Sequence, residues 1–307
     1  MNNNHNIRVS IGLPVYNGEK FLRKRIESLL NQTFGDFELI ISDNASTDYT
    51  QAICEEYARK DKRIRYIRQE RNMGAAWNFN FVLKEARHEY FVWVAVDDIL
   101  MPTFLERNIR ILEEKKDVVC SVSKIEMFGS MTEYLKDRSK DSMFIKIKKK
   151  IIKKIGYMDT FPIYGSYEER IKKFFKTCRH SLAFYGVYRT KQLHDNNLFL
   201  GGFVGLDTAF SLDILKYGDI YVIDEILMHV FDGGESRSGM IGATRNYNKN
   251  IIGIIFPFYS FTQWCLKHLG IGLFTKNIGF FIKINFIGEF SLCVDTVRLI
   301  TRIISRK

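Results

Sequence analysis

The sequence lacks the cysteine spacings that mark disulfide frameworks and zinc sites. Its five cysteines are odd in number and widely scattered, and none belongs to a CxxC pair. This cysteine usage argues against a disulfide framework and against a zinc site, and it favours a reducing compartment. We therefore expect the fold to rest on its apolar core.

Proline is also scarce, with four residues in a chain of 307. Because hydrophobic residues make up 46% and charged residues 26%, ordinary values for globular proteins, long disordered stretches are not expected. A chain of this length predicts one large domain with an appendage. No apolar segment precedes the first predicted strand, so we expect no secretory signal and a cytoplasmic location.

Long apolar runs and glycine-rich phosphate loops are missing as well. The uncharged run from Ile251 to Leu266 has 16 residues, fewer than the roughly 20 that span a bilayer, and it contains Pro257. It is therefore expected to lie at a membrane interface rather than to cross. No GxGxxG follows a predicted strand, which argues against a dinucleotide-binding dehydrogenase.

What the sequence does contain, over its first 125 residues, is a regular alternation of short apolar runs with amphipathic helical segments. This alternation predicts a doubly wound α/β sheet flanked by helices. Helices are expected near residues 19–30, from Asp48 and over 76–86. Strands are predicted at Val9 to Leu13, Phe37 to Ser42, Arg63 to Ile67, Tyr90 to Val96 and Val118 to Val122.

Beyond residue 125 the sequence is divided into regions by changes in charge and hydrophobicity. Residues 126–176 are charged and lysine-rich, which predicts an insertion or mobile region near the active face. A helix from Leu206 to Lys216 and a strand from Ile220 to Ile223 follow. We predict a domain over 1–250, with halves 1–125 and 126–250, and a helical region over 251–307.

The net charge of +11 is concentrated in two places. Residues 146–154 hold six lysines, and from residue 251 onward seven basic residues face two acidic ones. Arg298, Arg302 and Arg306 recur every four residues, so the C-terminal helix is predicted to be basic and amphipathic and to contact an anionic membrane. Nucleic acid is not expected as a partner, because aromatic side chains do not alternate with these charges.

Acidic and polar residues follow the predicted strands at the edge where open α/β sheets bind ligands. Asp43 follows the second strand, and Asp97 and Asp98 follow the fourth. Two carboxylates about 4 Å apart repel by about 4 kcal/mol at an effective dielectric near 20, which a divalent cation would offset. Mg²⁺ or Mn²⁺ bound with a diphosphate is therefore predicted at Asp97 and Asp98.

Four motifs together resemble glycosyltransferase family 2. They are GLPVYNGEKFL, SLLNQTFGDFELIISDNASTD, NMGAAWN at Asn72 to Asn78, and EYFVWVAVDD at Glu89 to Asp98. The likeness is close over the first 115 residues, is weaker over 126–176, and returns at GLDTAFSLDILKYGD, Gly205 to Asp219. No family motif is seen beyond Asn250.

The resemblance implies a GT-A fold, a nucleotide-diphosphate sugar donor, a divalent metal and inversion at the anomeric carbon. By position in these motifs, Pro14 and Tyr16 are expected to border the base, Asp43 to hydrogen-bond it and Asn78 to close its pocket. Asp97 is expected to lie by the ribose.

Two further roles follow from the same resemblance, metal ligation by Asp98 and general-base catalysis by Asp207. His229 and Arg237 are expected near the diphosphate on a looser local match. One departure from the family's pattern is Trp77, where many relatives carry arginine, so donor preference is expected to differ. The acceptor is expected to be a saccharide or a lipid-linked saccharide in surface polysaccharide or glycan assembly.

Alternatives stay open on the sequence alone. Asp97 and Asp98 are also typical of a turn, Asp43 of an Asx turn, Asp207 of a helix cap and His229 of a buried structural histidine. A non-catalytic nucleotide-sugar-binding module is one competing function, although the acidic positions are all present. A sugar nucleotidyltransferase is another, although its glycine-rich phosphate loop is missing.

Overall fold

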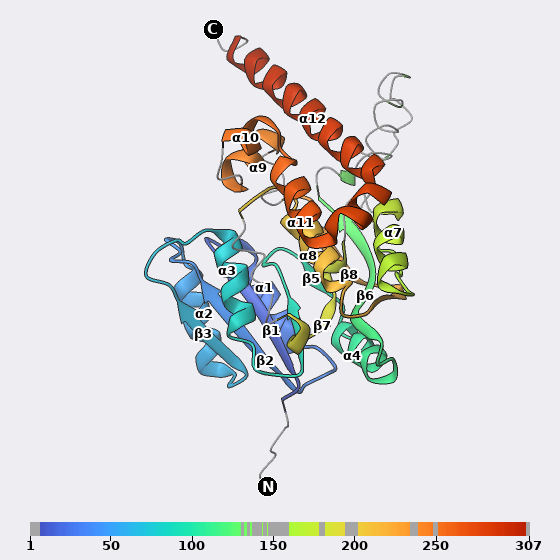
Figure 1. Cartoon of the computed structure of the whole chain (residues 1–307). Helices are drawn as coiled ribbons and strands as arrows, with labels where there is room; N and C mark the ends of the chain where they lie inside the picture. The colour runs from blue at the N-terminus through green and yellow to red at the C-terminus, as the bar shows by residue number, and fades with distance from the viewer. Residues whose placement is uncertain are drawn as a thin grey trace.

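The computed structural model is described here for residues 7–129, 132–133, 136, 143, 146, 160–177, 182–193, 202–233, 239–247 and 251–304. An eight-stranded mixed sheet crosses it in the order β3-β2-β1-β4-β7-β6-β8-β5 (Figure 1). Its strands are β1 (Val9–Val15), β2 (Phe37–Asp43), β3 (Ile64–Arg68), β4 (Tyr90–Trp93), β5 (Ile99–Leu100), β6 (Val118–Phe128), β7 (Val187–Arg189) and β8 (Asp219–Phe231).

The first four strands are parallel because each is joined to the next by a helical crossover. All seven residues of β1 and of β2 are buried, as expected for strands covered on both faces. The connecting helices are α1 (Glu19–Leu30), α2 (Thr50–Lys60) and α3 (Ala75–Lys84). The predicted doubly wound arrangement is thus confirmed.

Two apolar layers lie on opposite faces of the sheet. One layer packs α1, α2 and α4 (Phe104–Glu114) against β1 and β2, with Leu22 and Ile53 among its buried residues. The other packs α3, α7 (Tyr167–Thr177) and α8 (Leu206–Ile214) around Trp93 and Phe210, whose rings meet edge to face. The short 3-10 helices η1 (Leu182–Tyr185) and η2 (Thr190–Gln192) flank β7.

Element bounds differ from prediction mainly where tertiary pairing extends or shortens a strand. β4 ends at Trp93 rather than Val96, because the chain turns away before the acidic pair. β8 continues to Phe231 rather than Ile223, because it pairs in parallel with β6 as far as Phe128. Helix α2 begins at Thr50, and Asp48 precedes it and accepts a hydrogen bond from the Thr50 amide.

Much of the predicted insertion, residues 126–176, lies outside the described residues. Where it is described, β6 extends through Phe128, and Ile163 bridges to Ile220. Helix α7 then buries Ile171 and Phe174 against the sheet. These contacts add to the main core.

The C-terminal helices are α9 (Gly239–Tyr247), α10 (Ile251–Ile255), α11 (Tyr259–Lys276) and α12 (Ile278–Ile304). Phe261, Cys265 and Phe281 are buried in the same cluster as α7 and α8, which anchors this region to the sheet. The domain boundary predicted at 250 stays a prediction. Among the described residues no single helix is long and apolar enough to cross a membrane, although α11 and α12, bent by 112°, pass that test together.

Candidate active site

Three loops at the carboxyl ends of β1, β2 and β3 are tied together by side-chain hydrogen bonds. The Asn17 amide donates to Ser46 Oγ over 2.8 Å, and the Thr47 amide donates to Asn17 Oδ1 over 2.9 Å. Asn17 and Ala45 both have positive φ, which leaves these turns strained without such contacts. Tyr16 stands beside them with its side chain 47% exposed, whereas Pro14 is buried in β1.

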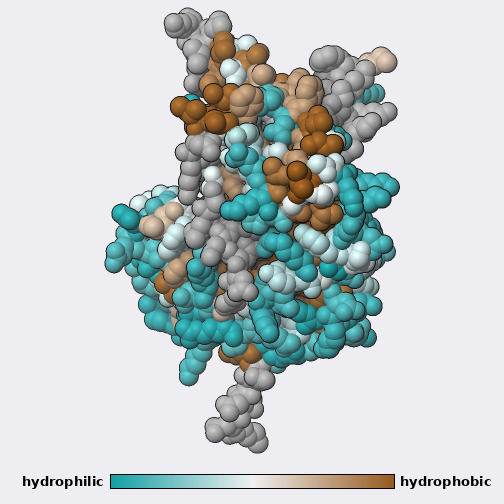
Figure 2. All heavy atoms as spheres, in the orientation of Figure 1, coloured by the Kyte–Doolittle hydropathy of each residue, from teal (hydrophilic) through white to brown (hydrophobic). Residues whose placement is uncertain are grey.

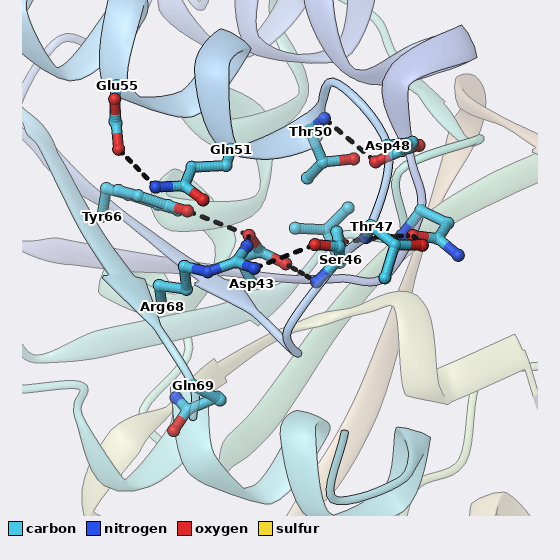
Figure 3. A network of polar contacts seen from close by, with 12 residues as sticks. Asp43, Ser46, Thr47, Asp48, Thr50, Gln51, Glu55, Tyr66, Arg68 and Gln69 are labelled. Atoms are coloured by element: carbon cyan, nitrogen blue, oxygen red, sulfur yellow. Dashed lines mark hydrogen bonds and ion pairs between the residues drawn. The ribbon is translucent and has the colours of Figure 1, made fainter. Parts of the chain in front are cut away.

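Asp43 is the centre of this network (Figure 3). Its Oδ2 accepts hydrogen bonds from the Tyr66 hydroxyl at 2.9 Å and from Arg68 Nη1 at 2.7 Å, and its Oδ1 accepts one from the Ser46 amide at 2.8 Å. The side chain is fully buried. Asp43 therefore organises the loop, in addition to any contact it makes with a ligand.

Asn78 and Asn44 fix the loop that precedes α3 against the end of β2. Asn78, buried on α3, accepts a hydrogen bond from Ser42 Oγ and donates to the Ser42 carbonyl over 2.9 Å. Asn44, also buried, accepts from the Met73 amide, and its amide nitrogen donates to Asn72 Oδ1. Gly74 follows with φ of 88°, a conformation that favours glycine, and α3 begins at the next residue.

The acidic pair occupies the loop between β4 and β5. Asp98 is 2% exposed, and its Oδ1 accepts one hydrogen bond, from the Phe231 amide at the end of β8. Its Oδ2 is buried with no hydrogen-bond partner in the described part of the chain. Burial, followed by the negative charge of Asp97, raises the pKa of Asp98 to about 7. Burial likewise raises the pKa of Asp97.

Arg25 is a buried cation beside this pair that the sequence analysis did not identify. It lies on the apolar face of α1, one turn from Leu22 and Leu29, and this spacing is the signal that could have revealed it. Its Nε donates to the Ala95 carbonyl over 3.1 Å. Burial lowers its pKa to about 10, and the charges of Asp98 and Asp97 oppose that effect.

Tyr185, on η1, was also missed, and its phenol is affected by the charges of both the acidic pair and Asp207. Asp207 lies half-buried in the first turn of α8, where its Oδ1 accepts a hydrogen bond from the Thr208 amide. Burial raises the pKa of the Tyr185 phenol above its usual range, and the charges of Asp98, Asp207 and Asp97 add to that effect. Three of the predicted carboxylates thus act on one hydroxyl.

Of the two residues predicted near the diphosphate, the structure describes one. His229, on β8, lies opposite Ile99 in the sheet, next to the acidic pair, and its Nδ1 is 3.1 Å from Glu126 Oε2. Arg237 lies outside the described residues. Trp77 stacks on Phe81 with ring centroids 5.1 Å apart.

A family model provides the deciding comparison. The model of glycosyl transferase family 2 matches residues 10–176, more than half of the chain. The chain belongs to glycosyl transferase family 2. Its β1, β2 and β4 loops and the acidic pair all fall inside the matched segment, whereas Asp207, His229 and helices α9 to α12 fall outside it.

Curated relatives in the family match only part of this chain. An uncharacterized glycosyltransferase of Methanocaldococcus jannaschii is 33% identical over 160 residues, 52% of this chain and 54% of the relative. The putative glycosyltransferase EpsH of Bacillus subtilis is 37% identical over 111 residues, 36% of this chain and 32% of the relative. The chain thus matches about half or less of the length of these relatives.

Solved structures of glycosyltransferases share the fold of this family 2 chain. TarS of S. aureus, solved with UDP-GlcNAc, has a TM-score of 0.56 and 20% identity and covers 85% of this chain and 73% of its own. The mannosyltransferase PcManGT of Pyrobaculum calidifontis, solved with GDP-Man and Mn²⁺, has a TM-score of 0.53 and 14% identity and covers 94% and 73%. The predicted GT-A architecture is confirmed.

The acidic pair of this family 2 chain fits a divalent cation. Asp98 has a buried oxygen that lacks a partner among the described residues, and an anion left so is costly without a cation or a proton. No group of three or more acidic, histidine or cysteine side chains that could hold a metal occurs in the described part of the chain. Asp98 would hold the ion together with a phosphate-bearing ligand, because Mg²⁺ is commonly bound by one or two carboxylates and by substrate phosphates.

Proposed function

We propose that this protein is an inverting glycosyltransferase that moves a sugar from a nucleotide-diphosphate sugar to a hydroxyl of a saccharide or lipid-linked acceptor. The observation that carries the proposal is the buried Oδ2 of Asp98, at the carboxyl end of the parallel strands, which has no hydrogen-bond partner among the residues that the structure describes. Ligands of open α/β sheets bind at that edge. The charges of Asp98, Asp207 and Asp97 all raise the pKa of Tyr185, which supports placing the donor and acceptor sides near each other.

Asp207 acts as the general base in this proposal. Its carboxylate takes the proton of the acceptor hydroxyl while the hydroxyl oxygen forms a bond to the anomeric carbon. The bond from that carbon to the donor's diphosphate oxygen breaks, and its electron pair leaves with the nucleoside diphosphate. A positioned base of this kind typically contributes about 10²- to 10⁴-fold in rate.

The donor site is assigned to the loops after β1, β2 and β4. Tyr16 would provide an exposed aromatic surface for the base, and Asp97 would lie by the ribose. Asp98 would hold Mg²⁺ or Mn²⁺, which supplies positive charge to the departing diphosphate. The UDP-GlcNAc and GDP-Man complexes of two proteins with this fold, one of them containing Mn²⁺, support a nucleotide sugar and a metal here.

The test is binding and slow hydrolysis of UDP-, GDP- and dTDP-sugars with Mn²⁺ or Mg²⁺ in the wild type, Asp98→Ala and Asp207→Asn. Metal-dependent binding that is lost in Asp98→Ala, with turnover but not binding lost in Asp207→Asn, would support the assigned roles. Nucleotide binding without any turnover would favour a non-catalytic module. Formation of a sugar nucleotide from a nucleoside triphosphate and a sugar phosphate would instead identify a nucleotidyltransferase.

The C-terminal helices support a membrane-bound acceptor. Figure 2 shows apolar residues gathered at the end of the molecule that these helices form, while the surface over the sheet is mostly hydrophilic. Helix α12 carries an exposed apolar stripe, which consists of Ile282, Phe286, Phe290, Val297 and Ile300. Exposed apolar residues of this kind on one helical face mark interaction sites.

Helix α10 adds a second exposed group, Ile251, Ile252, Ile254 and Ile255. Lys267 and Lys283 are exposed on α11 and α12, as interfacial helices that meet anionic lipid require. The predicted basic face of Arg298, Arg302 and Arg306 lies outside the described side chains. We propose peripheral contact with the inner face of the cell membrane, on the cytoplasmic side, with a saccharide on a lipid carrier as acceptor.

Vesicle flotation tests the membrane contact. Wild type is expected to float with vesicles of anionic phospholipid at low salt, and Phe286→Glu/Phe290→Glu is expected to remain in solution. A matched control is Tyr49→Glu, which removes an equally exposed aromatic residue from the sheet domain. Equal flotation of the double variant, or a wild type that stays soluble at low salt, would remove this part of the proposal.

A further inference from the structure

Arg25 is a buried cation in an otherwise apolar layer of the molecule. It lies on α1 between Leu22 and Leu29, on the helix face that packs against the sheet, and is 3% exposed. A charge buried in this way is costly unless an opposite charge compensates for it. Within the described residues its guanidinium makes no direct ion pair, and it donates to the Ala95 carbonyl over 3.1 Å and to Ser28 Oγ over 3.3 Å. Both acceptors are neutral, so they leave the positive charge uncompensated.

The Ala95 carbonyl places this cation beside the turn that carries the acidic pair. The same carbonyl oxygen accepts a hydrogen bond from the Asp98 amide over 3.4 Å. The Asp98 side chain is held in turn by the Phe231 amide. The guanidinium of Arg25 and the backbone of Asp98 therefore meet at one oxygen atom.

The far end of the same loop is fastened to the end of α1. Gln32, two residues after this helix, donates from Nε2 to the Met101 carbonyl over 2.9 Å. Its Oε1 accepts a hydrogen bond from the Leu105 amide over 3.1 Å. Because the loop between β4 and α4 is tied near both of its ends, the acidic pair keeps a fixed position relative to Arg25.

The charges of Arg25 and of the acidic pair act on each other through space. Burial lowers the pKa of Arg25, and the charges of Asp98 and Asp97 raise it. Burial raises the pKa of each carboxyl, and the charge of Arg25 lowers it. Two carboxylates beside one guanidinium leave an excess of one negative charge. A bare divalent cation is attracted less strongly to this cluster than to two uncompensated carboxylates.

We propose that Arg25 is the fixed counter-cation of the acidic pair, which offsets part of its negative charge before any ligand binds and so weakens the binding of a bare divalent cation. A cation that arrives with a nucleoside diphosphate brings negative charge with it, and the guanidinium then stabilises the complex. Arg25 acts through the turn and through its charge, so it is a positioning residue. The part of this inference that concerns the metal rests on the proposed function.

Thermal melts in EDTA at pH 8 test the counter-charge in the absence of any ligand. Wild type, Arg25→Met, Asp98→Asn and the double variant are compared, because an asparagine can still accept from the Phe231 amide and only the charge is lost. Arg25→Met is expected to lower the midpoint by about 5 °C or more in wild type. In the Asp98→Asn background the loss is expected to be less than about half as large.

Arg23→Met is the matched control for these melts. Arg23 lies on the same helix, is half-exposed and pairs with Glu56 rather than with the acidic loop. Its replacement is expected to change the midpoint equally little in both backgrounds. If Arg25→Met does not fold, the double variant with Asp98→Asn decides the matter, since its folding supports the inference and its failure to fold overturns it.

Electron paramagnetic resonance of free Mn²⁺ tests the effect on the metal. Arg25→Met is expected to bind Mn²⁺ alone about tenfold or more tightly than wild type, because a divalent cation no longer meets the charge of the guanidinium. Arg25→Lys, which keeps the charge, and Arg23→Met are expected to match the wild type. In saturating Mn²⁺, calorimetry is expected to show that Arg25→Met binds UDP or GDP about threefold or more weakly. A defect in folding alone would weaken both kinds of binding.

Two results would overturn the inference. An equal loss of midpoint for Arg25→Met in both backgrounds would show that Arg25 supports the turn without compensating Asp98. Unchanged or weaker binding of Mn²⁺ alone by Arg25→Met would show that its charge does not limit access of the ion. Failure of the proposed function gives a different pattern, in which wild type binds no diphosphate with Mn²⁺ while the coupling between Arg25 and Asp98 in EDTA persists.

Discussion

The sheet domain and the C-terminal helices differ in how far their apolar side chains are buried. In β1 and β2 every residue is buried, and the helices on both faces pack buried apolar side chains against the sheet. In α10 and α12 several apolar residues remain exposed, and among the described side chains of α12 the one that is deeply buried is Phe281. The first region is therefore stabilised by its own core, whereas the second leaves apolar side chains exposed among the described residues, as the proposed membrane contact requires.

The largest expected effect is on turnover, and it distinguishes the catalytic residue Asp207 from the exposed residues of α12. Asp207→Asn is expected to reduce turnover by about 10²- to 10⁴-fold, because the acceptor hydroxyl loses its proton acceptor. Phe286→Glu/Phe290→Glu is expected to leave turnover with a short, water-soluble acceptor unchanged. Initial rates with that acceptor check both. A loss in the double variant as large as in Asp207→Asn would mean that the helices belong to the catalytic unit.

The next largest effect is expected for a fully buried apolar residue of the sheet. Leu39→Ala is expected to lower the free energy of unfolding by about 3 kcal/mol, because it leaves a cavity in the fully buried centre of β2. Urea unfolding followed by circular dichroism measures it. A change below about 1 kcal/mol would indicate that the layer around β2 can collapse to fill the space.

A smaller effect concerns the buried acidic pair in metal-free protein. Burial raises the pKa of Asp98 from 3.8 to about 7, so between these values the folded state binds more protons than the unfolded state. Stability from this group is full below pH 4 and is lost as the pH rises through 7. In EDTA, Asp98→Asn is therefore expected to be more stable than wild type at pH 8 and to show no gain at pH 4. Thermal melts across this range decide it.

The smallest effect is expected on the α12 stripe. Phe290→Ala should change the free energy of unfolding by less than about 0.5 kcal/mol, because its ring is 61% exposed and packs little on the chain. The same urea titration as for Leu39→Ala measures it. A cost above about 2 kcal/mol would show that the stripe is covered in solution, and the contrast between the two regions would disappear.

The sheet domain was predictable from sequence because its signals are local. Apolar runs of strand length and the amphipathic pattern of α1 depend only on neighbouring residues. The positions of Asp43 at the end of β2 and of Asp97 and Asp98 after β4 followed from the same patterns. The full length of β8 was not predictable, because its continuation to Phe231 depends on pairing with β6, about a hundred residues earlier.

The missed site residues have a similar explanation. Arg25, Arg68 and Tyr185 gain their roles from partners on other elements, namely Ala95, Asp43 and the carboxylates around Asp98 and Asp207. An arginine on an apolar helix face is a visible signal for Arg25. Arg68 and Tyr185 carry no comparable signal, since an arginine or tyrosine at the end of a short strand or turn is usually exposed and unremarkable in sequence.

The course of β8 limits where related sequences can gain or lose residues. The strand leaves the loop after α8, which carries Asp207, and ends at the Phe231 amide that binds Asp98. On the way, Met228 and His229 pair with β5, next to Asp98. Removal or addition of one residue between Leu227 and Phe231 would turn the Phe231 amide away from Asp98. Length changes in related sequences should therefore be absent from this stretch and tolerated at the bulge around Asp224 and Glu225, where the pairing with β6 is already irregular.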